Sequence, residues 1–460
     1  VSYYRDIRPI LQEHCHGCHQ PAKRGGDYVM TSFADMVRGG ENGAAVVAKK
    51  SADSNLLTLI TPGDDGKAEM PKGKPALAAG AIEQITRWIE QGAMDDTPAS
   101  SAQAYDADHP PTYRGAPVIT AVAYSPDGTL LAVSGFHEVL LHKADGSEIV
   151  ARLVGLSQRI ESLAFSPDGK SLAVAGGSPS QMGEIQIWDV DSRKLRLSVP
   201  TTYDTVYGVS WSGGGTKVAY GCGDNTVRAI DAKTGKQVFQ QGAHSGWVLD
   251  TVFSKDASHL VSVSRDMSMK LSEFDSQRFI DNITSITPGA LKGGLAAVDR
   301  HPTRDEVVVG GSDGVPKIYR IFREAGKDRK IGDDFNLIRN FAAMPGRVAT
   351  VEYSRDGSRI VAGSSQDGTG QIRIFQVDDG KQLAQYAGEP GAIYAAAFSP
   401  DGKTVAAGGF QGKLLLINAE NGQLVRELSP VPLQDTAVSK TTAAAATTSA
   451  ATTDAEAPAK

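Results

Sequence analysis

Apolar residues recur at the 3.6-residue period of an amphipathic helix at both ends of the first 97 residues. They are Ile7, Ile10 and Leu11 at one end and Ile82, Ile85, Trp88 and Ile89 at the other. Such a period predicts helices that each bury one face. Glycine and proline are frequent between the two stretches, which argues against long regular elements there. This pattern therefore predicts that residues 1–97 form a small all-α domain with a loop-rich middle.

From residue 116 the period changes to the two-residue alternation of a β-strand, and the alternation is interrupted by a recurring tight turn. The turn is Ser-Pro-Asp-Gly at 125–128, 166–169 and 399–402, with weaker copies beginning at Ser212, Ser254, His301 and Ser354. Successive turns lie 41 to 53 residues apart. A repeat of this length with four short strands is typical of a propeller blade. We therefore expect an all-β, seven-bladed propeller over residues 116–433.

Two stretches have no such periodicity. Residues 98–115 are polar and rich in proline, which predicts an interdomain linker. Residues 434–460 consist largely of Ala, Thr and Ser and predict a disordered tail. A charged insert at 323–340 makes the fifth repeat the longest, and we expect it to be a surface loop.

Composition narrows the class of protein. The 460 residues carry 47 basic and 53 acidic side chains, a net charge of −6, without a cluster of Lys and Arg that would bind nucleic acid. No stretch approaches the roughly 18 apolar residues of a transmembrane segment. The chain begins at Val1 without a basic and apolar leader, so we expect either a processed mature form or a trimmed chain.

The chemistry of the chain is concentrated in Cys15-His16-Gly17-Cys18-His19. This Cys-x-x-Cys-His spacing allows two thiols to add to the vinyl groups of one haem while the adjacent imidazole ligates the iron. A pair of solvated thiols and a zinc site are the alternatives. Zinc usually takes four protein ligands, and the third cysteine, Cys222, lies far away in a repeat strand. We expect one covalently bound haem c.

Met70 is the best candidate for the second iron ligand. It lies in a loop with Pro71, Gly73 and three lysines, where a thioether can reach the open side of a haem. An ordinary loop methionine is the alternative. We expect Met30 and Met36 to pack in the core, and the motif holds His14 and His16 on or beside the side of His19.

With these motifs, residues 1–95 resemble class I cytochrome c, and more closely the planctomycete-type cytochrome c domain. The resemblance rests on Tyr4–Leu11, Cys15–His19, Gly39-Gly40, Met70-Pro71 and Arg87–Ala93. It implies haem iron held by His19 and Met70, and a helix over Ala79–Gln91 that packs across the motif helix with Trp88 toward the core. Because the haem of this family is attached outside the bacterial cytoplasm, it also implies a periplasmic or otherwise exported protein.

The β-rich region resembles the WD-repeat propellers. Trp188-Asp189 gives the family dipeptide, and Gly242-Ala-His244 approaches its Gly-His element. The resemblance implies a platform for protein partners. No catalytic residue stands out, and we expect Asp250 and His244 to form a structural pair and Cys222 to be buried. The last repeat contains its own fourth strand, so ring closure is expected to rest on packing between the first and seventh repeats.

Three functions remain open at this stage. The first is electron transfer by a monohaem cytochrome whose propeller docks a redox partner, with Lys67, Lys72 and Lys74 either near the haem edge or simply solvated. The second is a redox enzyme with another cofactor in the propeller, as in the architecture of cytochrome cd1, held by His137, His142, His244, His259 or His301. The third is a redox sensor or scaffold. We favour electron transfer over the other two functions, so we do not expect the protein to be an enzyme.

Overall fold

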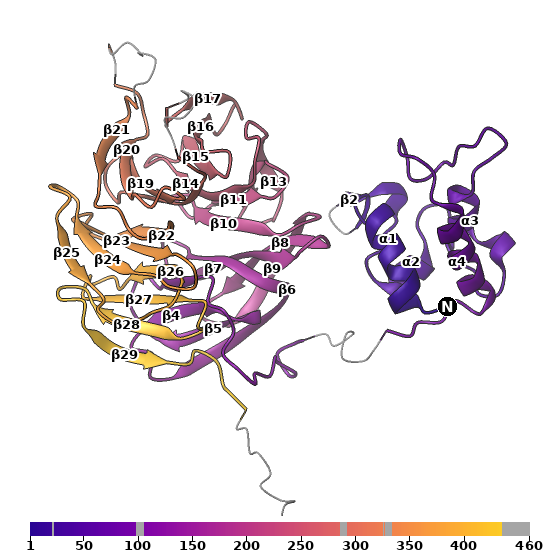
Figure 1. The fold of residues 1–460 in the computed structure, drawn as a ribbon, viewed down its shortest axis with the longest axis horizontal. Helices are drawn as coiled ribbons and strands as arrows, with labels where there is room; N and C mark the ends of the chain where they lie inside the picture. Colours follow the sequence, from indigo (N-terminus) through magenta and orange to yellow (C-terminus); the bar gives the residue numbers. More distant parts are fainter. Residues whose placement is uncertain (21–22, 98–104, 286–291, 325, 327–333, 435–460) are drawn as a thin grey trace, which may run out of the picture.

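The computed structural model describes residues 1–20, 23–97, 105–285, 292–324, 326 and 334–434. Figure 1 shows a small helical region formed by the first part of the chain and a large β-region formed by the rest. The helical region contains the π-turn Tyr3–Ile7, two 3₁₀ turns at Gly25–Asp27 and Ser51–Asp53, the helices α1 (Arg8–His14), α2 (Phe33–Arg38), α3 (Asn55–Ile60) and α4 (Ala79–Glu90), and the short strands β1 (His19–Gln20) and β2 (Lys23–Arg24). No helix in the described ranges is long and apolar enough to cross a membrane.

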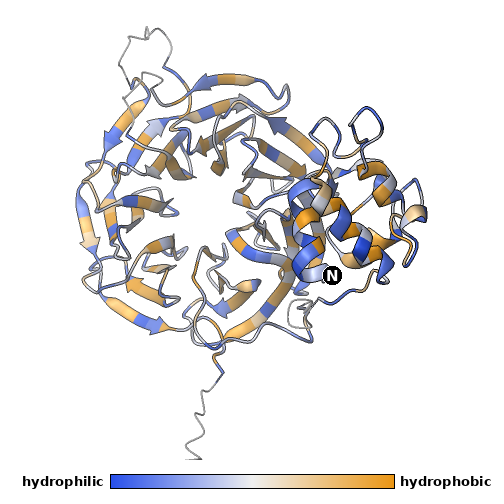
Figure 2. Cartoon of the chain, turned by 45° about the vertical axis from the view of Figure 1, so that its right-hand side comes forward, coloured by the Kyte–Doolittle hydropathy of each residue, from blue (hydrophilic) through white to orange (hydrophobic). Residues whose placement is uncertain are grey.

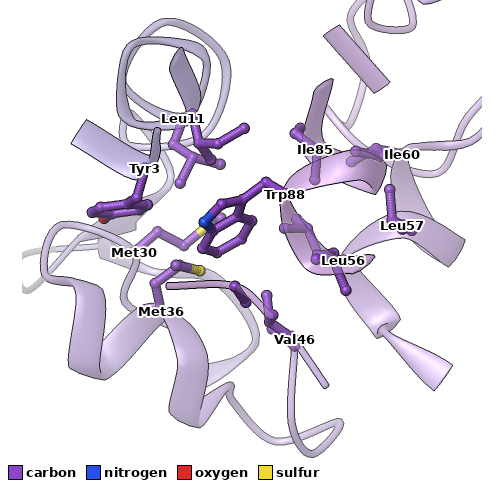
Figure 3. Close-up of a cluster of buried hydrophobic side chains, with 14 of the residues drawn as sticks. Tyr3, Leu11, Met30, Met36, Val46, Leu56, Leu57, Ile60, Ile85 and Trp88 are labelled. Atoms are coloured by element: carbon purple, nitrogen blue, oxygen red, sulfur yellow. The ribbon is translucent and has the colours of Figure 1, made fainter. Parts of the chain in front are cut away.

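Trp88 is the centre of the helical core. Its side chain is 1% exposed, and Figure 3 shows it between Tyr3, Met30 and Met36 on one side and Leu56 on the other. Its indole Nε1 donates to the carbonyl oxygen of Met94 at 3.1 Å, which satisfies the one polar atom of the ring. The helix expected over Ala79–Gln91 is confirmed as α4, and it buries Trp88 as the resemblance implied.

The β-region consists of antiparallel sheets in which consecutive strands pair. Five sheets have four strands each, in the orders β10-β11-β12-β13, β14-β15-β16-β17, β18-β19-β20-β21, β22-β23-β24-β25 and β26-β27-β28-β29. A sixth sheet has seven strands, β3 to β9. Figure 2 shows the sheets arranged around a central space. The strand bounds of the seven-stranded sheet are β3 (Val122–Tyr124), β4 (Leu130–Ser134), β5 (Phe136–Lys143), β6 (Ile149–Phe165), β7 (Ser171–Ser178), β8 (Met182–Asp189) and β9 (Lys194–Thr202).

The remaining strands follow the same meander. They are β10 (Val206–Trp211), β11 (Lys217–Cys222), β12 (Val227–Asp231), β13 (Gln237–Gln241), β14 (Val248–Phe253), β15 (His259–Ser264), β16 (Met269–Glu273), β17 (Phe279–Asn282), β18 (Leu295–Arg300), β19 (Glu306–Gly311), β20 (Lys317–Arg320), β21 (Leu337–Asn340), β22 (Arg347–Tyr353), β23 (Arg359–Ser365), β24 (Ile372–Gln376), β25 (Gln382–Gln385), β26 (Ile393–Phe398), β27 (Thr404–Gly409), β28 (Leu414–Asn418) and β29 (Leu424–Leu428).

The described strands of the β-region therefore form six sheets, whereas the repeats predict seven. The difference arises at β6, whose 17 residues pair with β5 through their first part and with β7 through their second. The chain stays extended through Leu156-Ser157-Gln158, so the fourth strand of the first repeat and the first strand of the second repeat are one continuous strand.

A second difference concerns the charged insert at 323–340. Its last four residues are not loop but strand β21, which pairs with β20 and completes the fifth sheet. Residues 325 and 327–333 of the insert lie outside the described residues, as do 98–104 of the predicted linker and 435–460 of the predicted tail. Within the predicted linker, the side chain of Tyr113 is buried, with 5% of its surface exposed, and its hydroxyl donates to the Glu138 carboxylate at 2.6 Å.

The first and last sheets contact one another. Ile119, Val122 and Leu131 pack in one buried cluster with Ala395 and Leu414. The N–H of Ile119 donates to the carbonyl oxygen of Gly409 at 3.0 Å, and Tyr113 forms a parallel bridge with Leu433. We call this contact between the first and the last described sheets the seam.

Because the strands alternate in direction, the connections of each sheet lie at two opposite ends. The Ser-Pro-Asp-Gly turns and the connections between third and fourth strands form one end, which we call the turn face. The connections between second and third strands and between successive repeats form the other. Tyr105 packs there against Phe136 and His137, with ring centroids 5.9 and 5.0 Å apart, so we call it the linker face.

Candidate functional site

The Cys-x-x-Cys-His motif forms a turn at the end of α1. Cys15 follows the last helical residue, and its carbonyl oxygen accepts hydrogen bonds from the N–H groups of Cys18 and His19, both at 3.1 Å. Both cysteines are free, with Cys15 half-buried and Cys18 exposed. Burial, together with the neighbouring Cys18, raises the pKa of the Cys15 thiol to about 11. The turn thus presents two free thiols and an imidazole within five residues.

His19 lies between this turn and the segment that follows. Its carbonyl oxygen accepts from the N–H of Met30 at 2.8 Å, and its ring lies 5.3 Å from that of Tyr28. The Tyr28 hydroxyl donates to the Met36 carbonyl at 2.8 Å, which fixes the phenol ring beside the histidine. The His19 Nδ1 is buried and has no hydrogen-bond partner among the described residues. Such an atom normally has one, so His19 is available to a ligand that the chain itself does not provide.

Met70 lies in the loop between α3 and α4. Its N–H donates to the carbonyl oxygen of Leu59 in α3 at 2.9 Å, and its side chain is half-buried against the same hydrophobic core that Cys15 contacts. The Met70-Pro71 bond is cis. At Met70 the loop returns to the core, whereas Lys67, Lys72 and Lys74 are exposed.

The other sulfur and imidazole groups near the motif have different environments. Met30 and Met36 are 1% and 0% exposed within the core, as expected. His14 is partly exposed beside Glu13, with 3.7 Å between Nε2 and the carboxylate. His16 is 5% exposed, and neither ring nitrogen makes a hydrogen bond of ordinary geometry with a described residue. Burial lowers the pKa of His16 to about 4, so this imidazole is neutral at physiological pH. The residues around His16 carry no pattern that predicts its burial.

These residues fit a covalently bound haem. Two free thiols one turn apart, an adjacent histidine with an unpaired buried nitrogen, and a thioether on the same core form the donor set that such a group uses. The porphyrin itself holds the haem iron through four nitrogens and the protein adds only one or two further ligands, so three converging His, Cys, Asp or Glu side chains are not required. No such group of three is present in the described part of the chain.

In the β-region the histidines contact separate partners. The expected pair of His244 with Asp250 is wrong, because His244 Nδ1 bonds Asp266 at 2.9 Å and Nε2 bonds Ser262 at 2.8 Å. Asp266 lies in the β15–β16 turn, which brings it over the histidine. Although burial acts to raise the pKa of Asp266, hydrogen bonds from His244, Ser268 and the Ser245 backbone hold it well below its usual range.

Asp250 instead faces a cavity of about 1020 Å³ that the first strands of the sheets surround. Its Oδ2 accepts the N–H of Val298 in the next sheet at 3.0 Å. Asp299 accepts the N–H of Tyr353 at 2.8 Å, and Glu352 accepts that of Phe398 at 3.0 Å. Burial raises the pKa of Asp250 to about 7 and that of Asp299 to about 6. These carboxyl groups join neighbouring sheets.

Cys222 is fully buried, as expected, and burial raises the pKa of its thiol to about 12.

Comparison with known families finds two kinds of match. Residues 15–73, which include Cys15, Cys18, His19 and Met70, match the model of planctomycete cytochrome C. Residues 122–212 match the WD40 domain of anaphase-promoting complex subunit 4, and residues 235–271 and 380–418 match the G-beta repeat of WD domains.

Among curated proteins the similarity is lower. Eukaryotic translation initiation factor 3 subunit I of Drosophila simulans is 26% identical over 210 residues, which cover 43% of this chain and 61% of the relative. The same subunit of Neosartorya fischeri is 25% identical over 196 residues, or 41% and 54%. A WD repeat-containing protein 91 homolog of Dictyostelium discoideum is 29% identical over 84 residues, or 18% and 11%. The chain thus spans less than two thirds of each relative. By these family matches, a segment similar to planctomycete cytochrome C precedes a region similar to WD repeats in this chain.

Proposed function

We propose that residues 1–97 bind one haem c and transfer single electrons to or from a protein partner. Cys15 and Cys18 would form the thioethers, and His19 and Met70 would ligate the iron. A haem bound at these residues would supply a one-electron redox couple. The chain would hold the ligands His19 and Met70 in place, and the hydrophobic core beside them would exclude water. The observation that carries the proposal is the unpaired buried nitrogen of His19, next to two free thiols, in a segment that matches a cytochrome family.

We further propose that the WD-repeat region is a closed ring of seven blades that binds proteins. The five four-stranded sheets and the two repeats that share β6 support seven units, and the seam supports closure. WD repeats commonly provide docking platforms rather than catalytic groups. Because haem c is attached outside the bacterial cytoplasm, the proposal includes a periplasmic or otherwise exported location.

The first test is an absorption spectrum of the purified protein with a pyridine haemochrome count and an intact mass. One haem per chain that acid acetone does not extract, and a reduced spectrum that carbon monoxide leaves unchanged, would support electron transfer by a six-coordinate iron. A chain without covalent haem would refute the proposal. A second chromophore, or a carbon monoxide shift, would favour the enzyme or the sensor instead.

Replacing Met70 tests its role as a ligand. In Met70→Ala we expect a lower reduction potential and an iron that binds carbon monoxide, because the thioether stabilises the ferrous state and occupies the sixth position. Redox titration and the carbon monoxide difference spectrum measure both effects. Met36→Leu is the matched control, since Met36 is buried in the core. An unchanged potential and spectrum in Met70→Ala would show that another group ligates the iron.

A further inference from the structure

The structure gives the imidazole of His19 close contacts, but its buried nitrogen makes no hydrogen bond. Among the described residues, Nδ1 has no hydrogen-bond partner. A histidine that ligates a metal usually fixes the orientation of its ring by donating the N–H of its second nitrogen to a carboxylate or a backbone carbonyl. Within the described chain, the orientation of the His19 ring therefore depends on the groups that pack against it.

Two residues of the segment that follows the motif lie against this ring. The ring centroid of Tyr28 is 5.3 Å from that of His19, with 57° between the two planes, a separation at which aromatic rings attract one another. A Cβ added at Gly25 would lie 3.4 Å from His19 Cε1 and 3.8 Å from Nδ1, so the backbone there runs close to one edge of the ring. A phenol ring and a stretch of backbone thus both limit how the imidazole can turn.

Tyr28 is itself fixed at several points. Its hydroxyl donates to the carbonyl oxygen of Met36 at 2.8 Å, and its N–H donates to that of Gly25 at 3.3 Å. Gly40 lies against its backbone, because a Cβ added at Gly40 would be 2.8 Å from Tyr28 Cβ and 2.3 Å from the carbonyl oxygen of Gly26. Burial raises the pKa of the Tyr28 hydroxyl, which therefore remains a donor. The phenol ring is held at both of its ends.

We infer that Tyr28 is a positioning residue for the haem ligand: its ring contact fixes the orientation of the His19 imidazole plane, in place of a hydrogen bond to that ring. The inference rests on the proposed function, because it requires that His19 ligates a haem iron. The plane of an axial imidazole determines how its π orbitals overlap with those of the iron. Tyr28 therefore affects the electronic structure of the haem through His19.

The test is the proton NMR spectrum of the oxidised full chain with its haem. In a low-spin ferric haem, the spread of the haem methyl resonances depends on the orientation of the axial imidazole plane. In Tyr28→Leu we expect this spread to narrow, because an imidazole that samples several orientations averages the shifts. Tyr28→Phe keeps the ring and loses only the hydroxyl, so it should retain the wild-type spread. Phe33→Leu is the matched control, since the Phe33 ring packs in the same core against Tyr3 and Trp88.

A pair of glycine variants tests the support behind Tyr28. Gly40→Ala should also change the methyl pattern, because the added Cβ has to displace the backbone of Gly26 and Tyr28. Gly80→Ala in α4 is its control, since no neighbouring atom of the described chain lies within 4 Å of a Cβ at that position. Melting curves by circular dichroism establish that each variant is folded at the temperature of the spectra.

Three results would overturn the inference. A wild-type spread in Tyr28→Leu would mean that Tyr28 does not orient His19. An equal narrowing in Phe33→Leu would assign the effect to a general loosening of the core. An equal narrowing in Tyr28→Phe would assign it to the hydroxyl rather than to the ring contact. A wild type without haem would refute the proposed function and this inference with it, and it would show no shifted methyl resonances in any variant, so the two failures are distinguishable.

Discussion

One buried carboxyl group links each of three successive repeats to the next sheet. These groups belong to Asp250, Asp299 and Glu352. Each carboxyl group accepts a backbone N–H from the next sheet at 2.8 to 3.0 Å. A protonated carboxyl group can accept this bond without the cost of a buried charge. Burial accordingly raises the pKa of each of them, and the pKa of Asp250 also rises because Asp299 is near.

This arrangement predicts a pH dependence of stability. In the unfolded chain these aspartates ionise near pH 3.8, whereas Asp250 ionises near pH 7 in the folded protein. The folded state therefore binds more protons between these values, and the free energy of unfolding falls as pH rises from about 4 to about 7. In Asp250→Asn we expect a smaller decrease in melting temperature between pH 5 and pH 8 than in the wild type.

Asp127→Asn is the control for this experiment. The Ser125 hydroxyl and the Thr129 N–H lower the pKa of Asp127, so its carboxylate is ionised in both states throughout pH 5 to 8. Its replacement should shift the melting temperature by a similar amount at every pH in that window. An equal pH slope in wild type and Asp250→Asn would contradict the assignment of the proton to Asp250.

At the scale of elements, the tight turn recurs from one repeat to the next along the β-region. Its glycine has positive φ and packs beside the turn of the preceding repeat. A Cβ at Gly128 would lie 3.7 Å from Pro400, and one at Gly169 would lie 3.5 Å from Pro126. At Gly357 (φ +73°) the neighbour is His301, and a Cβ would lie 2.2 Å from its Nε2.

We therefore expect Gly357→Ala to destabilise the protein by about 2 to 3 kcal/mol, since the left-handed backbone and the crowded histidine both oppose a side chain. Gly368→Ala should cost only about 1 kcal/mol, because its φ is +82° but no described atom lies within 4 Å of the added Cβ. Denaturant unfolding measures both values. Combining Gly357→Ala with His301→Ser should recover part of the loss, and no recovery would mean that His301 is not the obstacle.

Local patterns predicted those elements whose partners are close in sequence. The period of Ile82, Ile85 and Trp88 predicted α4, and the spacing of the turns predicted the strand meander. The continuous strand β6 was missed because a repeat boundary need not contain a turn. The pairing of His244 with Asp266 was missed because both Asp250 and Asp266 are close in sequence and only the fold distinguishes them.

The same limit applies to the candidate site. Cys15, Cys18 and His19 form a local motif, so sequence alone identifies them. The burial of His16 and the contact of Tyr28 with His19 depend on how the segment after the motif folds back over it. No pattern within the motif carries that information, and only the three-dimensional arrangement supplies it.

At the scale of the whole molecule, the seam is where the β-region is held together without a covalent connection. The hydroxyl of Tyr113 donates to the buried Glu138 at 2.6 Å, and Tyr113 also bridges to Leu433. We expect Tyr113→Phe to destabilise the protein by about 1 to 3 kcal/mol, because the Glu138 oxygen loses a buried partner. Tyr203→Phe, at an exposed position, should have no measurable effect. If the two variants had equal melting temperatures, the Tyr113 hydroxyl would not contribute to the stability of the seam.

The seam also bears on how such a chain can be assembled in evolution. The two ends of the β-region meet there, with Tyr113 beside Leu433. A module fused to either end would begin at nearly the same point on the surface, and neighbouring ends are what make circular permutation and domain fusion tolerable. We therefore expect that exchanging the order of the two regions in the gene would change little in where the cytochrome segment is attached to the β-region.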